Sequence, residues 1–258
     1  MESWLMQNWD AFQYGKFTEQ RMRPGLDLLG RIPTTDPGVV VDLGCGTGSL
    51  TQALHQRWPQ ARVVGVDASM EMLSAVPQTP GIKWHQADID DWQPDKPLDV
   101  IYSNAALHWV DNHARLFPRL LRYVKRGGCL AVQIPDNWDQ PSHTIPKRIL
   151  ESPVWPEAAR TALRRHPVAA ITEYRRWLAE ASMLDLWRTT YVQTLTGVDP
   201  VLEWVRGSVL APVVSAMNEP ERSSFEAALA EQYRLAYPPE EDGATLFPFS
   251  RLFIVAVR

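Results

Sequence analysis

The stretch from Val39 to Leu50 constrains the fold of this chain more than any other. Residues 39–43 form a short, mostly apolar and β-branched run, which is typical of a strand covered on both faces. Three alternating glycines follow at positions 44, 46 and 48, and because glycine has no Cβ, the backbone there can touch a ligand. Thr47 or Ser49 is placed to cap the helix that begins next. The stretch therefore predicts a strand, a ligand-binding turn and a helix.

The same alternation of strand and helix continues to residue 134. Apolar runs predict strands over residues 39–43, 61–67, 82–87, 98–103 and 129–134, and helical patterns predict helices over 18–31, 50–58 and 115–124. This alternation is typical of an α/β fold with a doubly wound, parallel sheet. After residue 134 the pattern changes to proline-rich segments and short helices. One strand is predicted around residues 187–192, and an apolar closing strand over residues 250–257.

Acidic residues mark the ends of the first three predicted strands. Asp42 precedes the glycine turn, Asp67 ends the second strand, and Asp88 follows the third. Because the carboxyl ends of parallel strands open into one crevice, we expect these acids to lie near one ligand. Asp67 either accepts hydrogen bonds from ribose hydroxyls or caps the helix that begins at Ser69. Asp88 either accepts from an adenine amino group or lies in a solvated turn.

The spacing of the glycines argues against a dinucleotide ligand. The dinucleotide fingerprint is G-x-G-x-x-G, whereas this turn reads G-x-G-x-G with Asp42 before it. A carboxylate in that place suits an ammonium group or a ribose better than a pyrophosphate, since like charges repel each other. S-adenosylmethionine has an amino-acid end and no phosphate, so it fits both requirements.

Composition and charge exclude several other function classes. The net charge is −4, and no dense run of Lys and Arg offers a surface to a nucleic-acid backbone. No apolar run approaches about 18 residues, and the first residues lack a basic and then apolar secretory pattern. The two cysteines, Cys45 and Cys129, predict no disulfide framework. We therefore expect a cytoplasmic protein that binds no nucleic acid and no membrane. We also expect a monomer without a metal, and a family resemblance, given next, implies a small anionic substrate.

Four segments resemble class I S-adenosylmethionine-dependent methyltransferases. They are Asp42-Leu43-Gly44-Cys45-Gly46-Thr47-Gly48, Asp67-Ala68-Ser69-Met70, Ala87-Asp88-Ile89 and Asn104-Ala105-Ala106-Leu107. Further segments, such as Gln133-Ile134-Pro135-Asp136-Asn137-Trp138 and Trp187-Arg188-Thr189-Thr190-Tyr191, are similar to the trans-aconitate 2-methyltransferase family, and this similarity covers nearly the whole chain. The resemblance implies a Rossmann-like, seven-stranded, mostly parallel sheet with a helical lid inserted after the fifth strand. It also implies transfer of a methyl group to one carboxylate of a small polycarboxylic acid.

The resemblance implies roles for individual residues as well. The cofactor-binding candidates are Arg23, Asp42, Gly44, Cys45, Gly46, Gly48, Asp67, Ala68, Ser69, Met70, Asp88, Ile89, Asn104 and Ala105. The substrate-binding candidates are Trp9, Tyr14, His108, Trp109, Trp138, Arg188, Arg206 and Arg251. The arginines among them suit carboxylates, because a guanidinium group binds a carboxylate through two parallel hydrogen bonds. Ala211 stands where the family commonly has an arginine, which leaves the identity of the acid open.

A carboxylate acceptor requires no general base. Its pKa of about 4 means that it is ionised at neutral pH, so the protein has only to align it with the methyl group and exclude water. Two alternatives remain open. One is a hydroxyl or other small-molecule acceptor, for which His108 and His113 are the nearest candidate bases, and the other is a cofactor-binding protein without turnover.

We expect residues 1–258 to form a single domain. In it, residues 1–37 form an arm and a helix over the cofactor, residues 38–134 the cofactor-binding core, residues 135–185 and 197–248 the substrate lid, and residues 249–258 the closing strand.

Overall fold

In the computed structural model of the chain, residues 18–76, 78–163, 167–207 and 209–258 are described, with side chains from residue 22 onward. These residues form two compact units. The core unit comprises residues 18–136, 167–189 and 251–258, and the helical unit comprises the described parts of 137–163 and 190–250. Each unit is described by itself below. Within the described residues, no helix is both long enough and apolar enough to cross a membrane.

A seven-stranded sheet runs through the core unit in the order β3-β2-β1-β4-β5-β7-β6. Its strands are β1 (Val39–Leu43), β2 (Arg62–Asp67), β3 (Ile82–Gln86), β4 (Leu98–Asn104), β5 (Val124–Pro135), β6 (Met183–Leu195) and β7 (Thr245–Val257). Strands β1 to β5 pair in parallel, and β7 runs antiparallel to β5. This arrangement confirms the prediction of a doubly wound, mostly parallel, seven-stranded sheet.

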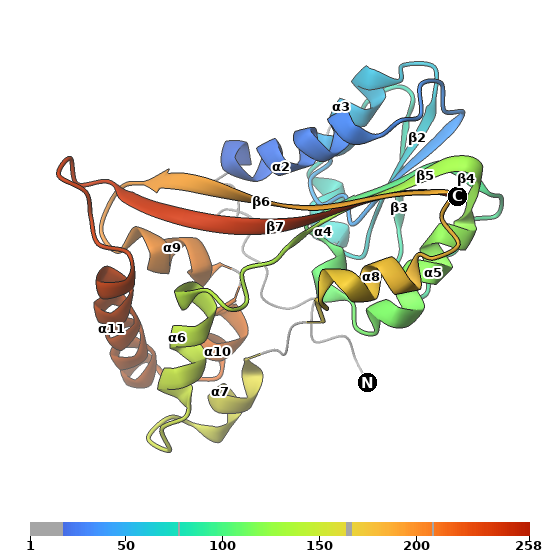
Figure 1. The fold of residues 1–258 in the computed structure, drawn as a ribbon. Coiled ribbons are helices and arrows are strands. Elements are labelled where there is room, and N and C mark those ends of the chain that lie inside the picture. The colour runs from blue at the N-terminus through green and yellow to red at the C-terminus, as the bar shows by residue number, and fades with distance from the viewer. Residues whose placement is uncertain (1–17, 77, 164–166, 208) are drawn as a thin grey trace. The chain divides into compact units, whose positions relative to one another are not determined.

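Helices cover both faces of this sheet, which explains why the central strands β1 and β4 are buried along nearly their whole length. The core unit contains α2 (Thr18–Arg31), α3 (Ser49–Arg57), α4 (Met70–Ser74), the short 3₁₀ helix η2 (Leu107–Trp109), α5 (His113–Tyr123) and α8 (Ile171–Trp177). Figure 1 shows α2 and α3 on one side of the sheet, and α5 with α8 on the other. On the first side, the Tyr102 hydroxyl of β4 donates to the carbonyl of Gly25 in α2 at 2.8 Å.

Helix α8 belongs to the core unit, whereas the sequence placed it in the lid. Tyr174 of α8 is fully buried, and its hydroxyl lies 2.7 Å from Nδ1 of His113 in α5. The Tyr174 ring also packs edge-on against Phe117 at 4.8 Å. The predicted lid segment 135–185 is therefore divided, because residues 167–185 pack with the sheet. An amphipathic helix does not reveal from its own pattern which partner it covers.

The helical unit holds the remaining helices, which follow β5 or β6 in the chain. They are α6 (Pro141–Leu150), α7 (Glu157–Ala162), α9 (Pro200–Arg206), α10 (Ala211–Ser215) and α11 (Glu219–Ala236). Leu202, Trp204, Phe225 and Phe247 are among the residues of its hydrophobic core. The role of these helices as a substrate lid stays a prediction.

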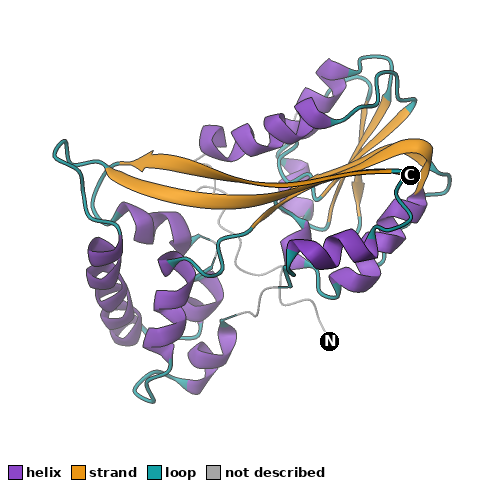
Figure 2. Cartoon of the chain, in the orientation of Figure 1, coloured by secondary structure: helices purple, strands orange, loops and turns teal. Residues whose placement is uncertain are grey.

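Strands β6 and β7 are longer than the sequence pattern suggested. The apolar pattern predicted strands over about residues 187–192 and 250–257, whereas the two strands cover Met183–Leu195 and Thr245–Val257. They appear in Figure 2 as long neighbouring strands. The boundary between the two units falls within both strands, at residues 189–190 and 250–251. Exposed side chains alternate with less exposed ones along much of β6, and many of the exposed ones are polar. The sequence pattern therefore did not indicate the full length of this strand.

Candidate functional site

The glycine turn after β1 is built from three residues with positive φ. Gly44, Gly46 and Gly48 have φ values of 79°, 54° and 78°, a region that glycine adopts readily. A Cβ on Gly44 would lie 2.2 Å from the Cβ of Ala106, and one on Gly48 would lie 2.4 Å from the Trp84 ring. Beside Gly46, by contrast, no heavy atom of the described residues lies within 4 Å of such a Cβ. Gly44 and Gly48 therefore serve close packing, and Gly46 faces open space.

The start of α3 differs from the predicted capping. Gly48 occupies the N-cap position, and within the described chain no side chain caps this helix. The prediction that Thr47 or Ser49 caps it was wrong. The turn is held instead by the backbone amides of Gly44 and Cys45, which both donate to the carbonyl of Val66, at 2.8 and 3.0 Å. The conformation of the turn is therefore set by its contact with β2. Because β2 lies about 20 residues further along the chain, the local sequence pattern does not reveal this contact.

Asp42 is a buried carboxyl group beneath the turn. It is 2% exposed, and its Oδ2 accepts a hydrogen bond from the Thr51 hydroxyl of α3 at 2.6 Å. Burial raises the pKa of Asp42 to about 7, with a smaller contribution from the negative charge of Asp67, while the Thr51 hydrogen bond lowers it. A positive group beside Asp42 would favour the ionised carboxylate, so the site is suited to a cation.

Asp67 ties the glycine turn to the end of β2. Its Oδ2 accepts from the backbone amide of Gly46 at 2.8 Å, and its Oδ1 accepts from the amide of Ser69 at 2.9 Å. Helix α4 is capped by Ser69, whose Oγ accepts from the amide of Met72 at 3.2 Å. Ser69, and not Asp67, therefore caps helix α4, so the first of the two predicted roles, binding ribose hydroxyls, is the one left for Asp67. Each carboxylate oxygen has a second lone pair, so Asp67 can still accept from hydroxyl groups.

The residues around the end of β3 form the third part of this edge. Asp88 is exposed, and its Oδ1 accepts from the amide of Asp90 at 2.9 Å. Arg119 of α5 donates to the carbonyl oxygens of Ile89, at 2.6 Å, and Asp90. Arg119 thus holds the loop in place from beneath. Sequence reasoning missed this residue, since an arginine on a helix face carries no local signal of its loop partner.

Three further cofactor candidates, Ala68, Met70 and Arg23, belong to the core unit. The carbonyl of Ala68 accepts from Nε2 of Gln86 at 3.1 Å, which joins the β2 and β3 ends. Met70 and Arg23 are both exposed, on α4 and α2 respectively.

The end of β4 carries a strained residue and an unpaired side-chain oxygen. Ala105 has a φ of 52°, which costs free energy for a residue with a Cβ, and its amide donates to the carbonyl of Gln133 at 2.9 Å. Asn104 precedes it, and within the described part of the chain no donor reaches its buried Oδ1. Because β4, β1, β2 and β3 pair in parallel, Asn104 and Ala105 lie at the same sheet edge as Asp42, Asp67 and Asp88. The role of these residues in binding a cofactor stays a prediction.

The substrate candidates of the core unit have different surroundings. His108 is buried in η2, and its ring lies 4.8 Å from the ring of Trp109. Arg188 of β6 forms an ion pair with Asp136, with 2.5 Å between Nε and Oδ2. Arg251 of β7 is 5% exposed, and its Nη1 lies 3.5 Å from Oε1 of Gln133.

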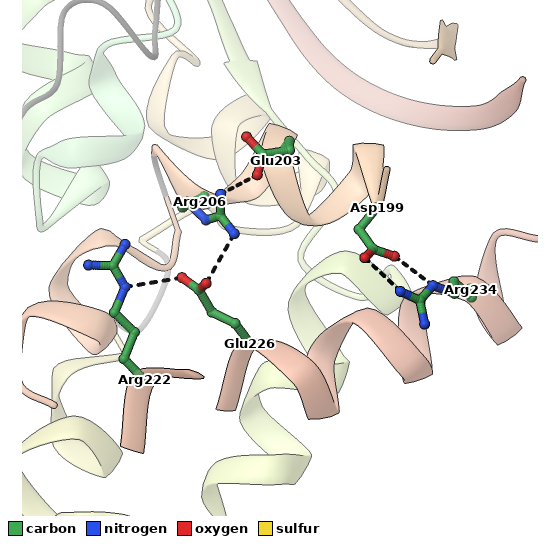
Figure 3. A network of polar contacts seen from close by, with 6 residues as sticks. All are labelled: Asp199, Glu203, Arg206, Arg222, Glu226 and Arg234. Atoms are coloured by element: carbon green, nitrogen blue, oxygen red, sulfur yellow. Dashed lines mark hydrogen bonds and ion pairs between the residues drawn. The ribbon is translucent and has the colours of Figure 1, made fainter. Parts of the chain in front are cut away.

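The substrate candidates outside the core unit are Trp138 and Arg206, together with Trp9 and Tyr14, which lie outside the described residues. The Trp138 ring packs edge-on against His143 at 4.9 Å. Arg206 forms ion pairs with Glu203 and with Glu226, the latter at 3.0 Å, as Figure 3 shows. Both terminal nitrogens of Arg206 thus contact carboxylates of the helical unit. This arrangement gives Arg206 a structural role that its position in the sequence did not suggest.

Comparison with known proteins places the whole chain among methyltransferases. Residues 40–128 match the family described as "Methyltransferase domain". The chain is 47% identical over 257 residues to a trans-aconitate 2-methyltransferase of Azoarcus sp. strain BH72, covering 98% of this chain and 100% of the relative. It is 45% identical over 260 residues to the Methylobacterium nodulans protein of the same name, with 98% and 99% coverage.

A solved structure shares the fold at much lower identity. It is the Haemonchus contortus phosphoethanolamine N-methyltransferase 2 in complex with phosphomonomethylethanolamine and S-adenosylhomocysteine. The TM-score is 0.55 at 13% identity, with 92% of this chain and 52% of that chain covered. At this identity the likeness concerns the fold alone.

Proposed function

This chain belongs to the trans-aconitate 2-methyltransferase family and is an S-adenosylmethionine-dependent methyltransferase, and we propose that it esterifies one carboxylate of a small polycarboxylic acid such as trans-aconitate. The observation that carries the proposal is the extent of the similarity. It spans 98% of the chain and so includes the helical unit as well as the core unit, whereas a shared cofactor site alone would cover only the core.

The edge formed by β1, β2, β3 and β4 fits S-adenosylmethionine. When bound, this cofactor supplies a methyl group on a positively charged sulfonium. Asp42 is buried where a cationic amino-acid end would restore its ionised form, and the open side of Gly46 gives room for the ligand. Asp67 retains lone pairs for ribose hydroxyls, and Asp88 is exposed at the next strand end for the adenine.

The acceptor is proposed to bind beside Asn104, over β4, β5 and β7. An ionised carboxylate is itself the nucleophile, so the residues around it have to bind, orient and shield it from water. Arg251 is the proposed anchor for an acceptor carboxylate, because its guanidinium is buried next to this edge. Arg188 is a less suitable anchor, since it already pairs with Asp136.

Histidine chemistry has less support. Both ring nitrogens of His113 are engaged, Nδ1 with the Tyr174 hydroxyl at 2.7 Å and Nε2 with the carbonyl of Leu107 at 2.9 Å. Because a carbonyl only accepts, Nε2 carries the proton and Nδ1 accepts from Tyr174. His113 therefore has a packing role. His108 remains the base candidate for the alternative of a hydroxyl acceptor.

Mass spectrometry of the products tests the proposal. Enzyme and S-adenosylmethionine are incubated with a panel of di- and tricarboxylic acids, and a mass increase of one methylene group is expected on at least one acid. With S-adenosylmethionine at a saturating concentration, the rate should be flat from about pH 6 to 9 for a carboxylate, since the acceptor is already ionised and needs no base with a pKa near 6.5. A rate that rises through this range and is abolished by His108→Ala would favour the hydroxyl acceptor instead.

The cofactor assignment has its own test. Asp67→Ala should weaken binding of S-adenosylhomocysteine, measured by calorimetry, while circular dichroism shows a retained fold. Unchanged affinity would contradict the role of Asp67. We further propose that the protein acts as a monomer in the cytoplasm without a metal. The charge pattern and the two free thiols, Cys45 and Cys129, support an intracellular location.

A further inference from the structure

Gln133 is a buried polar residue in a strand that is otherwise apolar around it. It lies in β5 between Val132 and Ile134, and all three side chains are fully buried. Burying an amide group without hydrogen-bond partners costs free energy, so a glutamine at this position needs a reason. The sequence identified it only as part of a motif and gave it no role.

Contact with Arg251 decides how the amide group of Gln133 points. Arg251 Nη1 lies 3.5 Å from Gln133 Oε1. A guanidinium group only donates hydrogen bonds, so the amide oxygen must face Arg251 and the amide nitrogen must face away. Within the described part of the chain, no acceptor reaches Nε2 of Gln133. The side chain therefore presents an unused N–H donor in a fixed direction.

The strand register places this donor at the acceptor edge. Asn104 of β4 pairs with Gln133, and Pro135, two residues further along β5, pairs with Arg251 of β7. Paired residues and residues two apart share one face of a sheet, so Asn104, Gln133 and Arg251 lie on the same face at the carboxyl end of β4 and β5. Asp42 pairs with Tyr102, two residues before Asn104, and so lies on this face as well.

We propose that Gln133 binds the acceptor, with its Nε2 donating a hydrogen bond to a carboxylate that also contacts the Arg251 guanidinium. This inference rests on the proposed function and names a specificity residue within that site. The missing partner of Nε2 must be an acceptor atom, and the neighbouring positive charge selects an anion. A neutral glutamine orients Arg251 without cancelling its charge, whereas a glutamate in its place would neutralise the arginine and repel a carboxylate.

Two substitutions test the inference. Gln133→Met keeps the volume and removes the donor, and Gln133→Glu keeps the oxygen toward Arg251 while adding a negative charge. With the acid that the wild-type protein methylates best, KM for the acid should rise about 10- to 100-fold in Gln133→Met, the range for losing a hydrogen bond to a charged group. The rise should be at least as large in Gln133→Glu. The dissociation constant of S-adenosylhomocysteine should stay within about twofold, which separates loss of the acceptor contact from loss of the fold.

A matched control exists in the helical unit. Oε1 of Gln232 in α11 accepts from Nη2 of Arg148 at 2.7 Å, on the surface. Gln232→Met and Gln232→Glu alter the same kind of glutamine–arginine contact and should leave KM for the acid unchanged.

The outcomes separate the two proposals. An unchanged KM in both Gln133 variants, with the acid still methylated, overturns the role of Gln133 and leaves the proposed function intact. The role is also overturned if both variants have a lower melting temperature and lose affinity for the acid and for S-adenosylhomocysteine to the same extent. That result indicates a purely structural role. If the wild-type protein methylates no acid of the panel, the proposed function fails and this inference fails with it.

Discussion

Replacing Asp42 with asparagine should make the stability of the cofactor-free protein less dependent on pH. Asparagine has nearly the same shape, and its amide oxygen can accept from the Thr51 hydroxyl as Oδ2 of Asp42 does. It differs from aspartate in that it cannot ionise. The comparison therefore isolates the free energy of holding a carboxylate in this buried position.

The magnitude follows from the pKa of Asp42, which burial raises from its ordinary value of 3.8 to about 7. The folded state thus keeps a proton that the unfolded state releases between these two pH values, so the folded state binds more protons. Stability consequently falls as pH rises through this window, and the loss is complete above about pH 7. Each pKa unit corresponds to about 1.4 kcal/mol, so the full loss is about 4 kcal/mol and the part between pH 5 and pH 8 is about 2.5 kcal/mol.

Urea unfolding at pH 5, 6, 7 and 8 measures this effect. Tryptophan fluorescence and far-ultraviolet circular dichroism are followed together, because coinciding transitions justify a two-state free energy. Other titrating groups contribute equally to both proteins and cancel in the difference. Between pH 5 and pH 8, the free energy of unfolding of Asp42→Asn should rise by about 2.5 kcal/mol relative to that of the wild-type protein. A difference that stays constant over this range would refute a raised pKa at Asp42.

Cofactor binding should show the opposite trend with pH. A ligand ammonium group beside Asp42 favours the ionised carboxylate, so the wild-type affinity for S-adenosylhomocysteine should increase as pH rises toward about 7. Asp42→Asn should bind more weakly and with less dependence on pH. Calorimetry in two buffers with different ionisation enthalpies would also detect the proton released on binding.

Further predictions concern the glycine turn and Arg206. Gly48→Ala should lower the free energy of unfolding by more than about 2 kcal/mol, since the new Cβ meets the Trp84 ring at 2.4 Å in addition to the unfavourable φ; equal melting temperatures for Gly48→Ala and the wild-type protein would contradict this. Gly46→Ala should cost only about 1–2 kcal/mol of stability, from the positive φ, yet weaken cofactor binding in calorimetry, because its Cβ would enter the open side of the turn. Arg206→Met should leave KM for the acid unchanged, because the Arg206 guanidinium pairs with Glu203 and Glu226. It should lower the melting temperature only slightly, because partly exposed ion pairs contribute little to stability. A tenfold rise in KM would instead show that Arg206 binds the substrate.

Sequence pattern alone predicted most of the core unit. The order of strands β1 to β5 and the acids at their ends were predictable because a buried strand and a glycine turn are local features, and because parallel strands place their carboxyl ends at one edge. Asp67 also proved to contact the turn directly, through the amide of Gly46. The capping of α3 was predicted wrongly, and the packing of α8 with the core unit was not foreseen, since both depend on contacts with distant parts of the chain.

The tertiary structure decided what each charged residue is able to do. Arg188, Arg206 and Arg251 look alike in the sequence, but the first two form ion pairs with acids of their own unit, and the third lies buried beside Gln133. Arg251 and Gln133 are 118 positions apart in the sequence, so no local pattern reports their contact. The sequence by itself determined a methyl-transferring core with a cofactor edge. Only the tertiary structure, through burial and long-range pairing, showed that Arg188 and Arg206 form ion pairs in their own units and that Arg251 is buried against Gln133.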